Sequence, residues 1–178
     1  FGCSFFLLAP ESPLVHDLVC GTEYEAEVMA LVEGAAKVSA VERAQGDREK
    51  HGAFTGRYVV NPINGEKVPV WVGDYIVADY GTGAVMGVPG HDQRDWDFAK
   101  TFGIDIVQVI KGGDIEKEAY TGDGEMINSD FLNGTDNKKE SIEKMLVFLK
   151  ERGIGEKGVQ YKMKDLSLIH ISEPTRLR

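Results

Sequence analysis

The sequence predicts an α/β domain with a mostly antiparallel, barrel-like sheet and flanking helices. Segments rich in Val, Ile, Tyr and Trp outnumber those with a helical pattern. Several neighbouring strand-like segments are separated by short turn signals, as in hairpins. A long proline-free segment rich in Ala, Glu, Val, Leu and Met is predicted to form helix that flanks the sheet.

The first quarter of the chain is expected to contain one strand followed by helices. Residues 5–9 are apolar and favour a buried strand. Residues 12–20 are expected to form a short helix that Gly21 closes. Residues 23–44 predict one long helix, or two helices interrupted near Gly34.

The middle of the chain is expected to supply most of the sheet. Residues 52–61, 68–72 and 75–78 are predicted strands because β-branched and aromatic residues dominate them. Residues 61–65, Asn-Pro-Ile-Asn-Gly, are a turn signal, so the first two strands are predicted to form a hairpin. Residues 84–88 add a short buried strand.

The last elements include two predicted helices. Residues 92–102 predict a helix with Gly103 as its C-terminal cap. Residues 104–110 predict another strand, and residues 159–163 a final one. Residues 137–152 predict an amphipathic helix that is again followed by glycine.

Residues 1–165 are expected to form one domain, and residues 166–178 a non-native tail. The segment 167–178, SLIHISEPTRLR, differs in character from everything before it and resembles translated sequencing-adaptor read-through. A native, flexible C-terminus is the alternative interpretation of this segment.

Composition narrows the classes of function. The 178 residues can bury a real core, and the net charge of −9 argues against a general nucleic-acid binder, which neutralises phosphates with basic residues. Local contact with one RNA end stays open if a larger protein supplies the affinity. No apolar run approaches a membrane span, so no membrane partner is expected. Cys3 and Cys20 lack metal spacing, so we expect buried free thiols in a reducing compartment, no disulfide, no metal site and a cytoplasmic protein.

Residues 79–103, DYGTGAVMGVPGHDQRDWDFAKTFG, are the most informative segment. A strand there delivers His91, Asp92, Arg94 and Asp95 to the start of a helix. The position of Asp92, three residues before Asp95, favours N-capping for Asp92. Asp95 lies in the first turn, where its carboxylate suits an ammonium group. Arg94 is expected to face solvent or to be ion-paired.

Five neighbouring residues have open interpretations. His91 can bond a ribose hydroxyl, position water or act as a general base, or it can be a turn histidine bonded to backbone. Met86 and Val88 alternate along a strand and share a face, either as core or as the wall of an amino-acid side-chain pocket. Gly81 and Thr82 lack a Walker lysine and predict a tight turn where a backbone or ligand approaches closely.

Four ordered segments carry a family resemblance: FG…LAPESPLV; FTGRYVVNPINGEKVPVWVGDYIVADYGTGAVMGVPGHDQRDWDFAKTFGI; AYTGDGEMINSDFLNG; and VQYKMKD. Together they cover nearly all of the chain up to Asp165 and closely resemble the editing domain of bacterial-type leucyl-tRNA synthetases. The isoleucyl and valyl editing domains are similar in fold. They usually carry a His-Gly pair, acidic residues and Tyr where this chain has His-Asp-Gln-Arg-Asp.

The resemblance implies a connective insertion domain of a class I synthetase, with the editing-domain fold of that class. The implied activity is post-transfer editing, the hydrolysis of the ester of mischarged tRNA(Leu) as part of a leucine–tRNA ligase. Water is the attacking species, assisted by the terminal ribose hydroxyl of the tRNA. The implied catalytic residues are Asp95, as the α-amino anchor, and His91. The implied substrate-binding residues are Asp92, Met86, Val88, Gly81 and Thr82.

The implied partners are the 3′ end of mischarged tRNA(Leu) and the rest of the synthetase in cis. No cofactor is expected in this domain, because ATP and Mg serve the synthetic domain of the parent enzyme. The family's threonine-rich loop lies immediately before the Phe-Gly with which this chain starts, so we expect a domain truncated at its N-terminal edge and inactive in isolation. The alternatives are a non-catalytic fragment that only binds the aminoacyl end of tRNA or a free amino acid, and a free-standing trans-editing protein.

Overall fold

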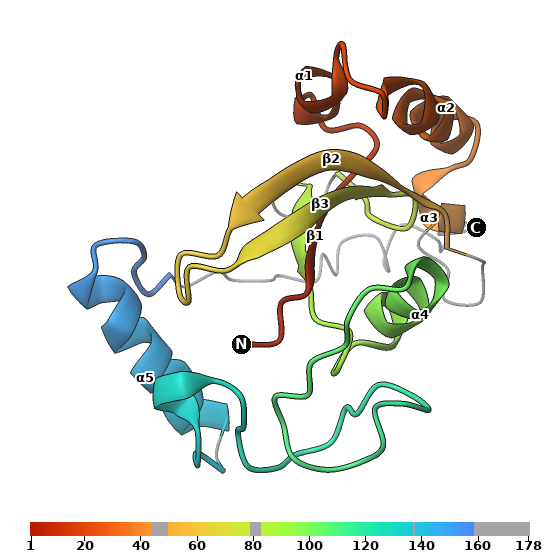
Figure 1. Ribbon diagram of the computed structural model, residues 1–178. Helices are drawn as coiled ribbons and strands as arrows, with labels where there is room; N and C mark the ends of the chain where they lie inside the picture. Colours follow the sequence, from red (N-terminus) through yellow and green to blue (C-terminus); the bar gives the residue numbers. More distant parts are fainter. Residues whose placement is uncertain (44–49, 79–82, 137, 159–178) are drawn as a thin grey trace, which may run out of the picture. The chain divides into compact units, whose positions relative to one another are not determined.

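The computed structural model describes residues 1–43, 50–78, 83–136 and 138–158, and the chain divides into two compact units, Phe1–Ser141 and Ile142–Arg178. The described strands of the first unit form a four-stranded sheet in the order β2-β3-β1-β4 (Figure 1). The strands are β1 (Phe5–Leu8), β2 (Gly52–Val60), β3 (Lys67–Gly73) and β4 (Ala84–Gly87).

The sheet is mixed and open rather than barrel-like. Strands β2 and β3 form the predicted antiparallel hairpin, and the Asn61 side chain accepts from the Ile63 N–H at 3.0 Å in the turn between them. Strand β1 pairs in parallel with β3 and antiparallel with β4. Two of the three pairings are therefore antiparallel, but β2 and β4 remain as edges of the described sheet. The expectation of a barrel-like sheet is wrong, because a barrel requires those edges to close on each other.

Two predicted strands are absent from the described sheet, and each has a physical reason. Residues 75–78 form a turn whose apolar side chains serve the core, with Tyr75 5% and Ile76 8% exposed. Residues 104–110 are extended but make only an isolated bridge, from Ile110 to Met126. Consecutive backbone N–H groups at Val109 and Ile110 donate to the imidazole of His91 rather than to a neighbouring strand. In residues 75–78 the apolar pattern therefore reflected burial rather than strand pairing, whereas in residues 104–110 only Val109 is buried.

The helices follow the predicted order, with one shifted boundary. They are α1 (Leu14–Val19), α2 (Glu25–Ala36), α3 (Ala40–Arg43), α4 (Gln93–Phe102) and α5 (Lys138–Glu151), with a 3₁₀ turn at Asp130–Leu132. The predicted helical region 23–44 is two helices, but Gly34 lies inside α2. The break falls just before Ser39, which exchanges capping hydrogen bonds with Glu42 and so starts α3.

Helix α5 confirms the predicted helix near residues 137–152, and none of its residues is buried among the described parts of the chain. Asn137 and the predicted strand 159–163 lie outside the described residues, as does the tail at 166–178. No helix within the described residues is long and apolar enough to cross a membrane.

Two apolar clusters cover the two faces of the sheet. Helices α1 and α2 cover one face through Val15, Val19 and Val28 (Figure 1). Helix α4 covers the other through Phe98, which is fully buried and stacks on Phe5 with ring centroids 5.2 Å apart. Helix α4 ends as predicted at Gly103, whose left-handed φ of 66° favours glycine. The core thus fixes where the start of α4 lies relative to β4.

We predict that Phe98→Ala lowers the free energy of unfolding by about 3–5 kcal/mol. The substitution empties the centre of an aromatic cluster that Phe98 forms with Phe5, Trp71, Tyr75 and Phe102. Urea unfolding of the chain measures the change. Leu14→Ala is the control: this α1 side chain is 54% exposed, so its loss should stay within about 0.5 kcal/mol. Equal losses in the two variants would contradict the account of the core.

Candidate functional site at the start of helix α4

A tight turn connects strand β4 to helix α4. The backbone N–H groups of His91 and Asp92 both donate to the Val88 carbonyl, at 3.0 and 3.1 Å. Gly90 is required in this turn, because a Cβ there would lie 2.6 Å from the Val107 carbonyl oxygen. The strand therefore delivers the polar residues directly to the helix start.

Asp92 is the N-cap of α4, which confirms the predicted capping. Its carboxylate accepts from the backbone N–H of Arg94 at 2.9 Å and of Asp95 at 3.4 Å. The Arg94 guanidinium lies 3.3 Å from the same carboxylate, which confirms an ion pair for Arg94. Burial opposes ionisation of Asp92, but the hydrogen bonds and charge of Arg94 outweigh it and lower the pKa of the Asp92 carboxyl. Asp92 raises the pKa of Arg94 in return.

Asp95 is a buried carboxylate that joins three segments. The residue is 7% exposed. One oxygen accepts from the Tyr75 hydroxyl at 3.0 Å, and the other accepts from the Val88 N–H at 2.9 Å. An ionised carboxylate offers about four acceptor positions, so the two bonds from the described residues use only part of its capacity.

The electrostatics of Asp95 oppose its full ionisation. Burial is the main cause that raises the pKa of the Asp95 carboxyl, and the negative charge of Asp92 adds to it. The Val88 N–H and the Tyr75 hydroxyl partly counter this rise. Burial and the charge of Asp95 together raise the pKa of the Tyr75 phenol far above its usual value. A cation bound at Asp95 would relieve the unfavourable charge, which suits this position to an ammonium group.

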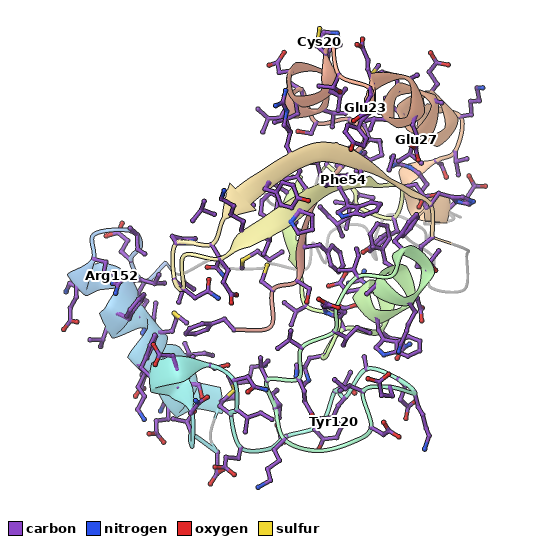
Figure 2. The ribbon with its side chains drawn as sticks, in the orientation of Figure 1. Cys20, Glu23, Glu27, Phe54, Tyr120 and Arg152 are labelled. Carbon is purple, nitrogen blue, oxygen red and sulfur yellow. The ribbon has the colours of Figure 1, made fainter. Side chains whose placement is uncertain are left out.

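His91 is held by backbone groups on both ring nitrogens. Its Nε2 accepts from the N–H groups of Val109 and Ile110, at 2.9 and 3.0 Å. Its Nδ1 therefore carries the hydrogen and donates to the Tyr120 carbonyl at 2.6 Å. Figure 2 shows Tyr120 in the long connection that follows α4. This is the arrangement of a turn histidine bonded to backbone, and it leaves neither ring nitrogen free for a proton from water.

The remaining predicted residues lie along and beyond strand β4. Met86 is 58% exposed. Its neighbour Ala84 packs on the α1/α2 side of the sheet, and Val85 packs on the α4 side. Side chains alternate between the two faces along a strand, so Met86 lies on the α1/α2 face, like Ala84. Val88 follows the strand, is half-buried and binds Asp95 through its N–H. The predicted site residues Gly81 and Thr82 lie outside the described residues.

Sequence reasoning missed a cavity of about 760 Å³ in the same unit. Burial and, to a smaller extent, the charge of Asp95 raise the pKa of the Cys3 thiol on its wall. Asn128 and Asp130, which also line it, have positive φ, a conformation uncommon outside glycine. The lining residues are Phe1, Cys3, Ser4, Asn64, Glu66, Lys67, Val68, Asp105, Val107, Asn128 and Asp130. They come from four separate parts of the chain, and no sequence pattern groups them.

The fold and site define an α/β domain in which a capped helix start carries two carboxylates, Asp92 and the buried Asp95. The chain belongs to the family of leucyl-tRNA synthetase editing domains, whose family model matches residues 1–149. It is also similar to the agnB2 LeuRS of Agrobacterium radiobacter K84, solved as a ternary complex with tRNA and LeuAMS. The identity is 32% and the TM-score 0.66 over 92% of this chain, which spans only 17% of that protein.

The opposite pKa directions at the helix start give a titration order. On acidification Asp95 should take up a proton before Asp92, as measured by carbon NMR of the side-chain carboxyls, with Asp95→Asn to assign the resonance. The raised pKa of Asp95 means that its contribution to stability declines as the pH rises from 3.8 through its folded pKa. Asp92 stabilises the fold above pH 3.8, and that contribution is lost as the pH falls through its lowered pKa. The reverse order of titration would show that the described bonding is wrong.

Proposed function

We propose that this chain performs post-transfer editing: it hydrolyses the ester between tRNA(Leu) and a wrong amino acid, as part of a leucine–tRNA ligase. The family membership supports the general function. The single observation that carries the chemistry is the buried Asp95 carboxylate, which accepts two hydrogen bonds from the described residues, fewer than its full capacity.

Asp95 is proposed to hold the α-amino group of the mischarged amino acid. At neutral pH that group is an ammonium, and a charge-assisted hydrogen bond to a buried carboxylate is stronger than one in bulk water. Fixing the amino group fixes the ester carbonyl a few bonds away. Water then attacks the carbonyl carbon, assisted by the terminal ribose hydroxyl. The bond to the tRNA oxygen breaks and releases the free amino acid and the tRNA. The protein contributes mainly by positioning the ester.

The other residues have supporting parts in this proposal. Asp92 caps the helix and so fixes Asp95 in the first turn. His91, which the sequence suggested as catalytic, becomes a positioning residue that holds the segment after α4. Val88, whose N–H binds Asp95, forms part of the wall for the amino-acid side chain in this proposal, whereas Met86 lies on the α1/α2 face of β4 and is not assigned to that wall. Gly81 and Thr82 remain proposed substrate-binding residues on the family resemblance alone. Leucine must be excluded by steric blocking, because binding alone separates similar aliphatic side chains poorly.

The proposed partners are the 3′ end of mischarged tRNA(Leu) and the rest of a synthetase in cis, in the cytoplasm. The similar LeuRS was solved with tRNA, which supports the tRNA partner. The net charge of −9 opposes binding of the tRNA body, so most of the affinity is assigned to the rest of the enzyme. No cofactor is proposed for the hydrolysis, and ATP and Mg are assigned to the synthetic part.

The test of this proposal is Asp95→Asn in a leucyl-tRNA synthetase that carries this chain as its editing domain. The substitution keeps the side-chain volume and removes the charge. Loss of one charge-assisted hydrogen bond is worth about 1.5–3 kcal/mol, so deacylation of mischarged tRNA(Leu) should fall at least roughly ten- to a hundredfold. Leucylation, measured on the same preparation, should stay near normal.

Two control variants separate substrate binding from structure. Asp97→Asn changes another aspartate on the same helix and should leave deacylation unchanged. Tyr75→Phe removes the hydroxyl bound to Asp95 but keeps the carboxylate, so it should retain most of the activity. Unchanged deacylation in Asp95→Asn would remove Asp95 from the site. Equal losses of deacylation in Asp95→Asn and Tyr75→Phe would mean that Asp95 has only a structural role.

The alternative is a domain that binds the aminoacyl end, or a free amino acid, without hydrolysing the ester. The buried Asp95 carboxylate, with its two bonds from the described residues, is compatible with this function too. A non-hydrolysable aminoacyl-adenosine amide distinguishes the two. Binding of the amide to a synthetase that shows no deacylation would favour the alternative.

A further inference from the structure

Three side chains with metal-ligand chemistry meet where helix α1 connects to helix α2. They are His16 on α1, Cys20 at its C-cap and Glu25 at the start of α2. One ligand atom from each, an imidazole nitrogen, the thiol sulfur and a carboxylate oxygen, lies within 4.8 Å of the other two. The sequence shows no familiar metal spacing here, so the expectation of no metal site rested on the pattern alone.

We propose that His16, Cys20 and Glu25 bind a zinc ion, with water as the fourth ligand. Zinc accepts nitrogen, sulfur and oxygen ligands in a tetrahedral arrangement, whereas the thiolate disfavours Mg²⁺ and Ca²⁺. Metal–ligand lengths of about 2.0–2.3 Å place tetrahedral ligand atoms roughly 3.3–3.6 Å apart. The side chains of His16 and Cys20 are exposed, so small rotations close the remaining gap. Binding displaces the thiol proton of Cys20 to solvent.

Backbone hydrogen bonds already hold the three proposed ligands close to one another. His16 and Cys20 are four residues apart on one helical turn, and the Cys20 N–H donates to the His16 carbonyl at 2.9 Å. The chain then reverses at Gly21, whose φ is 73°. The Gly21 N–H donates to one carboxylate oxygen of Glu25 at 2.7 Å. This bond orients the carboxylate and leaves its other oxygen for the metal.

The surroundings favour a cation. The carboxylate of Asp17 lies 3.8 Å from Nδ1 of His16, which is too far for a hydrogen bond but adds negative charge beside the proposed ligands. Figure 2 shows Cys20 at the outer end of the α1–α2 connection, with Glu23 and Glu27 nearby along the chain. These acidic residues add negative charge next to the proposed ligands.

The proposed site lies apart from the start of α4 and has a structural role. Val15, Val19 and Val28 hold α1 and α2 on one face of the sheet, while α4 packs on the other. A zinc ion bound to ligands from both α1 and α2 would fasten these two helices together. The proposal is independent of the editing function, since none of its three ligands belongs to the α4 site.

The experiment is titration of the reduced chain with Zn²⁺ and Co²⁺ in the absence of oxygen. The wild-type chain should bind one Zn²⁺, and its Co²⁺ form should show a thiolate-to-metal charge-transfer band. Zinc should also raise the thermal midpoint, because it binds the folded chain. Cys20→Ser should abolish the charge-transfer band. Cys20→Ser, His16→Gln and Glu25→Gln should each weaken zinc binding at least tenfold.

Matched controls make the result specific to these ligands. Cys3→Ser removes the other cysteine, and Glu33→Gln removes an acid two turns further along α2 that has no part in the proposed site; both should bind zinc as the wild type does. Circular dichroism without metal checks that every variant is folded. Wild-type zinc affinity in Cys20→Ser, loss of the band in Cys3→Ser, or no binding by the wild-type chain would each overturn the proposal.

Discussion

The hydrogen bonds of the Asp95 carboxylate are the constraint on which the site depends. They join the first turn of α4 to the end of β4, through Val88, and to the turn after β3, through Tyr75. Asp92 reinforces the junction by capping the same helix. Because the carboxylate is buried, its charge is tolerated only where donors surround it. The Asp95 carboxylate that joins α4, β4 and the turn after β3 would therefore also be stabilised by a bound cation.

The rest of the domain holds this junction in place. Phe98 lies one turn beyond Asp95 on α4 and anchors the helix in the aromatic cluster. His91 fastens the segment that follows α4 to the turn that precedes it, through three backbone groups. Substrate positioning to within a fraction of an ångström requires such support, since small displacements cost much of the rate.

Local sequence signals predicted local structure well. The cap at Asp92, the ion pair of Arg94, the C-cap at Gly103 and the hairpin turn near Asn61 are all present, because each depends on neighbouring residues. Features set by distant contacts were predicted poorly. No local pattern shows that the His91 imidazole accepts hydrogen bonds from the N–H groups of Val109 and Ile110. Because those groups are used in this way, residues 104–110 do not form the predicted strand. The prediction of a barrel-like sheet was wrong because the pairing of distant strands also depends on such contacts. The cluster of His16, Cys20 and Glu25 was missed because the turn between α1 and α2 brings these residues together, and their spacing in the sequence does not show that turn.

The central claim is that Asp95 binds the amino group of the aminoacyl ester. The most direct test is a crystal structure of the synthetase that carries this chain, bound to a non-hydrolysable aminoacyl-adenosine amide. The account predicts an ammonium nitrogen about 2.7–2.9 Å from an Asp95 oxygen, with the bonds from Tyr75 and Val88 retained. An ammonium group bound elsewhere, more than about 4 Å from that carboxylate, would contradict it.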